Sequence, residues 1–324
     1  MSQYLQAFTD EEMQRAKLLL ASQVVKMMGR KFEEGDWSSI YCGAKGIPER
    51  GWSNLNIDIM HEGLGVEHKM LCVYVKPGGS LKEVCGTSLM HPAATRSIRV
   101  ESTHVHPEEA MREIFRQHKE LIESRESMVR QNSQNNSADM RTGWLIWERS
   151  LTEFLYFEEK MFIPDPEFYY AEWNERLAGG TRKSSKNLWI YEKLTGKKRY
   201  SVTTKAGVKI QPYFDVPAPT SPELYYFKVQ GEEITPDKII IWISPATAKE
   251  LFEVVGNLEP DFVSRLIIKA ASSYELHENQ SGYNDSMAFS LLISKEAYEH
   301  LVKTWQGVSD EHRVRLLIQT FKTP

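Results

Sequence analysis

The chain lacks the features that mark membrane, secreted and zinc-binding proteins. No apolar run approaches the roughly 20 residues that a helix needs to cross a bilayer. The first residues contain neither a basic nor an apolar segment, so we expect no signal peptide and a cytoplasmic location. Only three cysteines are present, without CxxC spacing, and we expect them to be reduced and buried rather than zinc-bound: Cys42, Cys72 and Cys85.

The motifs of several large enzyme classes are also missing. The sequence contains no glycine-rich phosphate loop, no HExxH motif, no GxSxG motif and no internal repeat. Its 324 residues have ordinary apolar and charged fractions. They are enough for one large or two medium domains, each with a core.

The chain as a whole lacks a net positive charge, since it carries −4. One segment, however, is strongly positive. Residues 181–210 contain a single acid, Glu192, and have a net charge of +8. Such a concentration on an acidic protein indicates contact with a polyanion. The alternative is a solvated lysine-rich turn that keeps an exposed hairpin soluble. We assign nucleic-acid contacts to Arg182, Lys183, Lys186, Lys197, Lys198, Arg199, Lys205 and Lys209, whereas Lys193 completes the nine basic residues.

The same segment predicts a β-hairpin. Residues 187–192 and 199–204 are rich in strand-forming residues and flank Leu194-Thr-Gly-Lys197, with Gly196 in the turn. Trp189, Tyr191 and Tyr200 add aromatic rings to this ribbon. A basic, aromatic ribbon of this kind can follow phosphates or enter a groove of DNA.

A shorter hairpin is predicted earlier in the chain, over residues 55–69. Its first strand alternates apolar and polar residues, and glycines at 63 and 65 supply the turn. With the turn centred on Glu62-Gly63, Asp58 lies directly opposite Glu67, with Cβ atoms roughly 5 Å apart. Lys69 follows two residues later, on the same face as Glu67.

Two facing carboxylates repel each other unless a positive charge lies between them. A divalent cation with oxygen ligands would relieve the repulsion between Asp58 and Glu67. The Lys69 ammonium would then lie near the metal, where a water molecule can be activated. These are the working parts of one kind of metal-dependent phosphodiesterase.

Asp58, an eight-residue gap and Glu67-x-Lys69 resemble the PD-(D/E)xK nuclease superfamily, which includes most type II restriction endonucleases. The resemblance covers the hairpin and, loosely, the order of elements in the first half. Ile57 stands where the pattern often has proline. The resemblance implies that Asp58, Glu67 and the carbonyl of His68 hold Mg²⁺, which Mn²⁺ can replace. It also implies that Lys69 orients or deprotonates the attacking water.

A second Glu-x-Lys, Glu158-x-Lys160, lies in a segment where apolar residues recur at helical spacing, from Trp147 to Met161. A helix does not place residues two apart on one face. We therefore interpret Glu158 and Lys160 as solvated charges, with Asp139 as the partner acid in the alternative that the segment is catalytic.

The order of expected elements agrees with the nuclease core. We expect a helix over 9–28 that begins with a Thr9/Glu12 capping box, a strand over 38–43, and the hairpin extended to residue 75. A helix from Pro107 to Val129, a polar loop and a strand over 143–147 follow. This is αβββαβ order, in an α/β (α+β) fold with a mixed central sheet flanked by helices. We assign residues 1–165 to the nuclease core and 166–324 to a second, α+β domain that recognises DNA.

These inferences predict an Mg²⁺-dependent, sequence-specific endonuclease that cuts double-stranded DNA as a homodimer. The polar loop after Cys85 offers further DNA contacts, although its side chains could equally cap their own backbone: Ser88, His91, Thr95 and Arg96. One rival is a non-catalytic nucleic-acid-binding protein that uses the 181–210 ribbon. Another is a metabolic enzyme with a nucleotide ligand.

Overall fold

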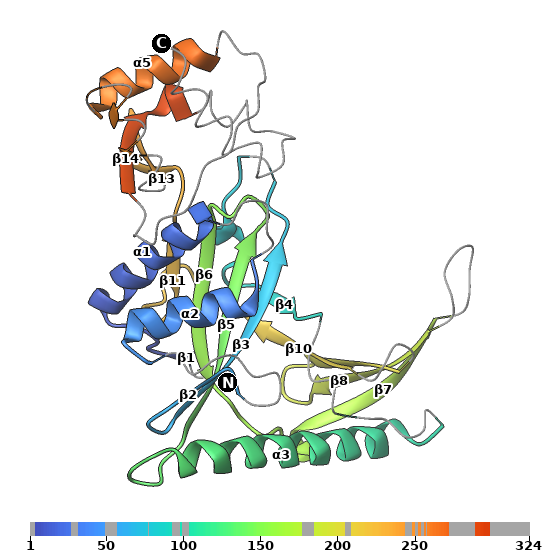
Figure 1. Ribbon diagram of the computed structural model, residues 1–324. Coiled ribbons are helices and arrows are strands. Elements are labelled where there is room, and N and C mark those ends of the chain that lie inside the picture. Colours follow the sequence, from blue (N-terminus) through green and yellow to red (C-terminus); the bar gives the residue numbers. More distant parts are fainter. Residues whose placement is uncertain are drawn as a thin grey trace.

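Three β-sheets and the helices that pack on them form the molecule (Figure 1). The computed structural model describes residues 4–26, 32–48, 57–76, 78–92, 98, 104–176, 185–204, 209–243, 248–249, 252–253, 256, 258–271 and 289–298. None of the helices in these ranges is long and apolar enough to cross a membrane.

The first sheet is mixed and has six strands. Its order is β1-β6-β5-β3-β2, and β11 also pairs with β6. β3 and β5 run parallel, whereas the other neighbours are antiparallel. The strands are β1 (Tyr4–Leu5), β2 (Ile59–His61), β3 (Leu64–Val73), β5 (Asp139–Glu148), β6 (Glu153–Lys160) and β11 (Tyr225–Lys228).

Helices α1 (Asp10–Lys26) and α2 (Glu34–Lys45) cover one face of this sheet (Figure 1). The capping box of α1 is confirmed, because the Thr9 amide donates to Glu12 and the Glu12 amide donates to Thr9. The strand expected over 38–43 is wrong, since these residues belong to α2. The buried residues Trp37, Ile40, Tyr41 and Ala44 recur at the i, i+3, i+4, i+7 spacing of a helix.

The long helix α3 (Pro107–Gln131) comes after β3 and before β5 in the sequence, and these two strands run parallel. The predicted position of this helix is confirmed. Pro107 stands at its first turn. Near its C-terminal end, Val129 packs with Ile57 and Met140 beneath the first sheet. Its N-terminal half packs on the second sheet instead, so one helix supports both sheets (Figure 1).

The second sheet is antiparallel, in the order β4-β10-β9-β8-β7. Its strands are β4 (Ser88–Met90), β7 (Tyr169–Arg176), β8 (Ser185–Glu192), β9 (Lys198–Thr203) and β10 (Lys209–Asp215). The hairpin predicted around Gly196 is confirmed as β8–β9, and Gly196 has a φ of 66° in its turn. Leu188, Ile190 and Val202 face α3 and form a core with it.

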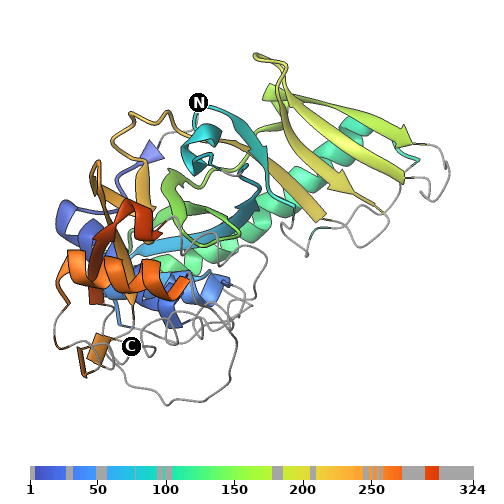
Figure 2. The same ribbon diagram turned by 90° about the horizontal axis from the view of Figure 1, so that it is seen from above.

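A third, smaller sheet lies on the far side of the first sheet from the second one (Figure 2). It consists of β12 (Glu232–Thr235), β13 (Lys238–Ile243) and β14 (Phe289–Ser294), and α5 (Pro260–Ala271) packs on it. An ion pair of 2.6 Å between Lys17 of α1 and Glu232 joins it to the rest. Short 3-10 helices lie at Leu81–Val84 (η1) and Pro166–Phe168 (η2).

The helix expected around Glu158 is wrong. Residues 139–160 form the antiparallel strands β5 and β6, in which Trp147 pairs with Phe154. Nearly every residue from 143 to 158 that belongs to these strands is buried, because the sheet is covered on both faces. A strand buried on both faces shows no alternation, so its apolar positions can imitate helical spacing.

The mixed sheet flanked by helices is as expected, whereas the order of its elements differs in detail. The chain runs α1, α2, β2, β3, β4, α3, β5, and β4 pairs in the second sheet. Strands also cross the expected boundary at residue 165, since β11 pairs in the first sheet and β4 in the second. The division into units at 165 stays a prediction.

The cysteines are all free thiols. Cys42 is buried in the core beneath α2, as expected. Cys85 is half-buried and Cys72 is exposed on β3, so the expectation of burial is wrong for these two.

Candidate active site

The hairpin of β2 and β3 has the register that the sequence predicts. Ile59 pairs with Val66 and Met60 pairs with Gly65, so Asp58, one residue further out, faces Glu67. The turn residues Glu62 and Gly63 both have positive φ, 45° and 87°. Two such residues form the tight turn whose twist matches that of a hairpin.

Asp58 is held in place by the strand opposite. Its Oδ2 accepts a hydrogen bond of 2.6 Å from the backbone amide of His68. Burial, and secondly the negative charge of Glu67, raise the pKa of Asp58 to about 7. A carboxyl group with this pKa is half ionised at neutral pH and becomes fully ionised when a cation binds.

Glu67 lies between two cations. Its Oε1 accepts a hydrogen bond of 2.6 Å from Lys69 Nζ, and its Oε2 lies 3.1 Å from Arg125 Nη1 on α3. The three side chains are largely buried, with exposed fractions of 13% for Glu67, 19% for Lys69 and 17% for Arg125. Lys69 therefore lies beside Glu67, as the sequence predicts.

The structure adds Arg125 and Glu34 to the predicted site residues. Arg125 stands on the apolar stripe of α3, three residues after Ile122 and four before Val129, and a charge at such a position is a signal that sequence reasoning missed. Glu34 stands in the first turn of α2. Burial raises its pKa, while the charges of Lys69 and Glu67 lower and raise it respectively, so Glu34 is within electrostatic reach of the pair.

His68 points to the opposite face of β3 from Glu67 and Lys69. Its ring is fully buried, with Nδ1 3.1 Å from Ser38 Oγ and Nε2 3.3 Å from the Tyr156 hydroxyl. Burial lowers the pKa of His68 to about 3, which keeps the ring neutral. Only its backbone carbonyl remains for the metal contact that the resemblance implies.

The hydrogen bonds continue from His68 to a buried ion pair. The Tyr156 hydroxyl donates to Glu158 Oε1 at 2.8 Å, and Glu158 Oε2 lies 2.9 Å from Arg141 Nη1. Glu158 is fully buried. Its expected role as a solvated charge is therefore wrong, because β6 turns it towards the core beneath α2.

The donors at the hairpin are oxygen atoms, the kind that Mg²⁺ and Mn²⁺ prefer. The described residues contain no group of three or more His, Cys, Asp or Glu side chains that could hold a metal ion. Mg²⁺ does not need one, because it keeps several waters and uses one or two carboxylates together with phosphate oxygens. Asp58, Glu67 and the His68 carbonyl are oxygen donors of this kind.

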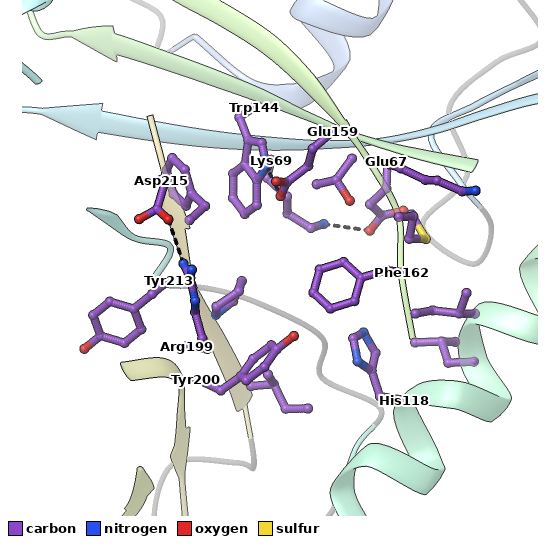
Figure 3. Close-up of a pocket in the computed structure, with 18 of the residues that line it drawn as sticks. Glu67, Lys69, His118, Trp144, Glu159, Phe162, Arg199, Tyr200, Tyr213 and Asp215 are labelled. Carbon is purple, nitrogen blue, oxygen red and sulfur yellow. Dashed lines mark hydrogen bonds and ion pairs between the residues drawn. The ribbon is translucent and has the colours of Figure 1, made fainter. Parts of the chain in front are cut away.

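Glu67 and Lys69 open into a cavity between the first sheet, the second sheet and α3 (Figure 3). Its volume is about 250 Å³. Glu67 and Lys69 form one wall, His118 and Arg125 of α3 another, and Arg199 and Asp215 of the second sheet a third. The two sheets meet at this cavity through the stacked rings of Trp144 and Phe214, whose centroids are 3.9 Å apart.

The basic ribbon carries less free charge than its sequence suggests. Arg199 pairs with Asp215 at 2.9 Å and with Glu192 at 3.4 Å, and Lys197 lies 3.6 Å from Asp215. Lys186 pairs with Glu175 at 2.7 Å. Glu175 and Asp215 lie outside the 181–210 window, so a count over that window overstates the net charge.

The aromatic residues of the ribbon divide between its two faces. Tyr200 is buried against α3, whereas Trp189 and Tyr191 are half-buried. The Lys198 ammonium lies 3.9 Å from the centre of the Trp189 ring and 5.1 Å from that of Tyr213. Lys198 is thus held over aromatic rings, on the face of the sheet away from α3.

The remaining predicted DNA contacts have different outcomes. Ser88 is exposed on β4. His91 is buried, and its Nε2 lies 3.0 Å from the carbonyl of Met70, so its expected contact with DNA is wrong. Five of the predicted contacts lie outside the described residues: Thr95, Arg96, Arg182, Lys183 and Lys205. For Lys209, only the backbone is described.

Comparisons of the whole chain with known proteins found no likeness. No protein-family model, no curated protein and no solved structure matches it.

Proposed function

We propose that the protein is an Mg²⁺-dependent endonuclease of the PD-(D/E)xK type that hydrolyses phosphodiester bonds in double-stranded DNA at a specific sequence. One observation carries the proposal: Asp58 faces Glu67 across a hairpin, and Lys69 contacts Glu67 at 2.6 Å in the wall of a cavity. Asp58, Glu67 and the His68 carbonyl would hold the metal ion.

Bound Mg²⁺ would lower the pKa of a water molecule and offset charge on the phosphate. As an ammonium, Lys69 orients the attacking water; only as the neutral amine would it accept the proton of that water. Glu67 fixes the position of the Lys69 ammonium through their hydrogen bond. Arg125 neutralises the other oxygen of Glu67 in the absence of metal and becomes available to the phosphate when Glu67 binds metal.

The topology around the hairpin supports the same proposal. The motif lies on an antiparallel pair, β2 and β3, and α3 comes before β5, which runs parallel to β3. This arrangement resembles the second half of the αβββαβ core. The first helix and the hairpin are separated by α2 rather than by a strand.

We propose that the second sheet binds the DNA. Lys198, Trp189 and Tyr213 combine a positive charge with aromatic rings on its face away from α3. A homodimer would place two such sites on one duplex and cut both strands, since a two-fold axis matches a palindromic sequence. This surface also supports a second candidate, a non-catalytic nucleic-acid-binding protein.

Cleavage of genomic DNA separates the two candidates. Long bacteriophage and bacterial DNAs, methylated and unmethylated, would be incubated with the wild type, Lys69→Ala and Lys160→Ala, each with Mg²⁺, with Mn²⁺ or with EDTA. Lys160 is the matched control, because it also belongs to a Glu-x-Lys sequence and lines the same cavity. We expect discrete metal-dependent fragments with the wild type and Lys160→Ala, and none with Lys69→Ala.

The nuclease proposal fails if no DNA is cut by the wild type. It fails equally if Lys69→Ala cuts as fast as the wild type. Salt-sensitive binding of duplex DNA without cleavage would leave the binding protein as the function.

A further inference from the structure

The wall of the cavity that α3 forms contains two buried polar atoms that have no hydrogen-bond partner within the part of the chain that the structure describes. They are Nδ1 of His118 and Nε of Arg125. Buried polar groups are nearly always paired, by protein or by ordered water, so two unpaired atoms in one cavity wall indicate that something else binds there. The proposed hydrolysis does not use His118.

The chemistry of these two groups favours a neutral polar ligand. Burial, and secondly the charge of Arg125, lower the pKa of His118 to about 4, so its ring is neutral at physiological pH. A neutral imidazole can donate at one nitrogen and accept at the other. Arg125 Nε adds a donor beside it, while Arg125 Nη1 is already engaged by Glu67.

The rest of the cavity supplies aromatic surface. Phe162, directly after β6, projects among the lining side chains, although 50% of its surface is exposed (Figure 3). The rings of Tyr200, Tyr213 and Trp144 also line the cavity. Flat rings and a few converging polar atoms are what a protein uses to hold an unstacked base.

The size of the cavity limits what can enter. Its volume of about 250 Å³ corresponds to roughly eight water molecules at about 30 Å³ each. It is slightly below the lower end of pockets that hold drug-sized ligands, about 300 Å³. A base with part of its sugar fits this volume. A DNA duplex does not enter, since even its major groove is about 12 Å wide.

We propose that this cavity accepts one nucleobase that is rotated out of the DNA next to the cleaved phosphate. Phe162 stacks on the base, and His118 with Arg125 hydrogen-bonds its edge. The base is adjacent to the cut, because Glu67 and Lys69 form a wall of the same cavity. This inference rests on the proposed nuclease function and adds to it the form of the substrate at the moment of cleavage.

A duplex with an extra base tests the proposal. The probe is a fluorescein-labelled 20-base-pair duplex with one central unpaired adenosine, compared with the same duplex fully paired, in EDTA. An unpaired base avoids the cost of unpairing and unstacking, so we expect the wild type to bind the bulged duplex about tenfold more tightly. Fluorescence anisotropy measures both dissociation constants.

The variants assign the preference to the cavity. Phe162→Ala and His118→Ala are each expected to reduce it to less than about threefold, since base stacking and edge contacts are lost. Phe168→Ala is the matched control, because Phe168 is also an exposed aromatic side chain, at 66%, but does not line the cavity. His118→Gln, which keeps a donor and an acceptor, retains most of the preference and replaces His118→Ala if that variant does not fold.

Equal affinity of the wild type for the two duplexes overturns the proposal. A preference that persists in both Phe162→Ala and His118→Gln or His118→Ala overturns it as well. If DNA is cut in a metal- and Lys69-dependent manner without any preference for the bulge, only this inference fails. If neither duplex binds and no DNA is cut, the proposed function fails with it.

Discussion

At the scale of single residues, the site is defined by charges that face one another in a buried place. The Asp58–Glu67 pairing follows from a local pattern, two alternating strands and a glycine turn, and the sequence therefore predicts it. Arg125 and Glu34 reach the same point from α3 and α2, which are distant in sequence. Contacts of that kind depend on the packing of helices, and no local pattern encodes them.

Replacing Asp58 changes how stability depends on pH. The folded-state pKa of Asp58 is about 7, above its ordinary value of 3.8, so its contribution favours folding below about pH 4 and is lost as the pH rises through 7. We expect Asp58→Asn to raise the free energy of unfolding by about 2 kcal/mol at pH 8 and to leave it unchanged at pH 4. Urea unfolding at the two pH values measures this.

Mg²⁺ provides the control for that variant. Metal binding requires the ionised carboxylate, so millimolar Mg²⁺ at pH 8 should stabilise the wild type and leave Asp58→Asn unaffected. An equal shift in the melting temperature of both proteins would contradict the assignment of Asp58 as a ligand.

When Arg125 is removed, Lys69 is the one cationic partner that Glu67 keeps among the described residues. Since both members of the pair are largely buried, we expect Arg125→Ala to lower the free energy of unfolding by about 3 kcal/mol. Part of this loss should be recovered with Mg²⁺, which takes over the neutralisation of Glu67. Arg116→Ala on the same helix, where the ion pairs are solvent-exposed, should leave the urea midpoint unchanged.

At the scale of elements, the sequence predicts those whose ends carry local signals. The capping box of α1, the Pro107 start of α3 and the Gly196 turn all mark their elements correctly. The strand expected over 143–147 is confirmed as part of β5. The helical interpretation of β6 is wrong because both faces of this strand are covered, by α1 and α2 on one side and by Phe214 and Val216 on the other. Two-sided burial depends on the tertiary fold and removes the alternation by which a strand is recognised.

At Gly143 of β5, the side chains of Tyr156 and His68 lie close to the backbone. A Cβ atom there would lie 2.4 Å from the Tyr156 hydroxyl and 2.8 Å from the His68 ring. We expect Gly143→Ala to disrupt the hydrogen bond between these two residues and to lower the free energy of unfolding by about 2 kcal/mol.

A helical glycine serves as the control. Gly35 in α2 has nothing within 4 Å of the position of a Cβ atom, so Gly35→Ala should stabilise the protein by about 0.5 kcal/mol. Chemical denaturation of both variants gives the comparison. A Gly143→Ala protein as stable as the wild type would show that β5 can shift to make room.

At the scale of the whole molecule, the cavity exists because one helix, α3, packs on both the first and the second sheet. The sequence does not predict that β4 joins the second sheet or that β11 joins the first, since pairing between distant strands is set by the core and not by their own residues. The same limit applies to charge. Asp215 approaches Arg199 and Lys197 only in the folded sheet, so the sequence alone overstates the positive charge of the ribbon.

The salt dependence of DNA binding measures the charge that remains. The eight assigned phosphate contacts would give a slope of log K against log salt of about −7, and subtracting the paired Lys186, Lys197 and Arg199 leaves about −4.5. Asp215→Asn frees Lys197 from its partner, whereas Arg199 keeps its ion pair with Glu192, so the slope should steepen by about 1. Fluorescence anisotropy titrations of DNA binding at about 50 to 300 mM KCl test both slopes. An unchanged slope in Asp215→Asn would show that the 181–210 ribbon does not contact the DNA.

Helix α3 also fixes the distance between two polar side chains of the cavity wall. Arg125, which contacts Glu67, and His118, whose Nδ1 has no partner among the described residues, stand seven residues apart on one helix. Seven residues correspond to about 10 Å along the axis. This distance is set by the pitch of a single helix and not by the packing of one sheet against another. The spacing of these two side chains in the cavity wall therefore does not depend on how one sheet lies against the other.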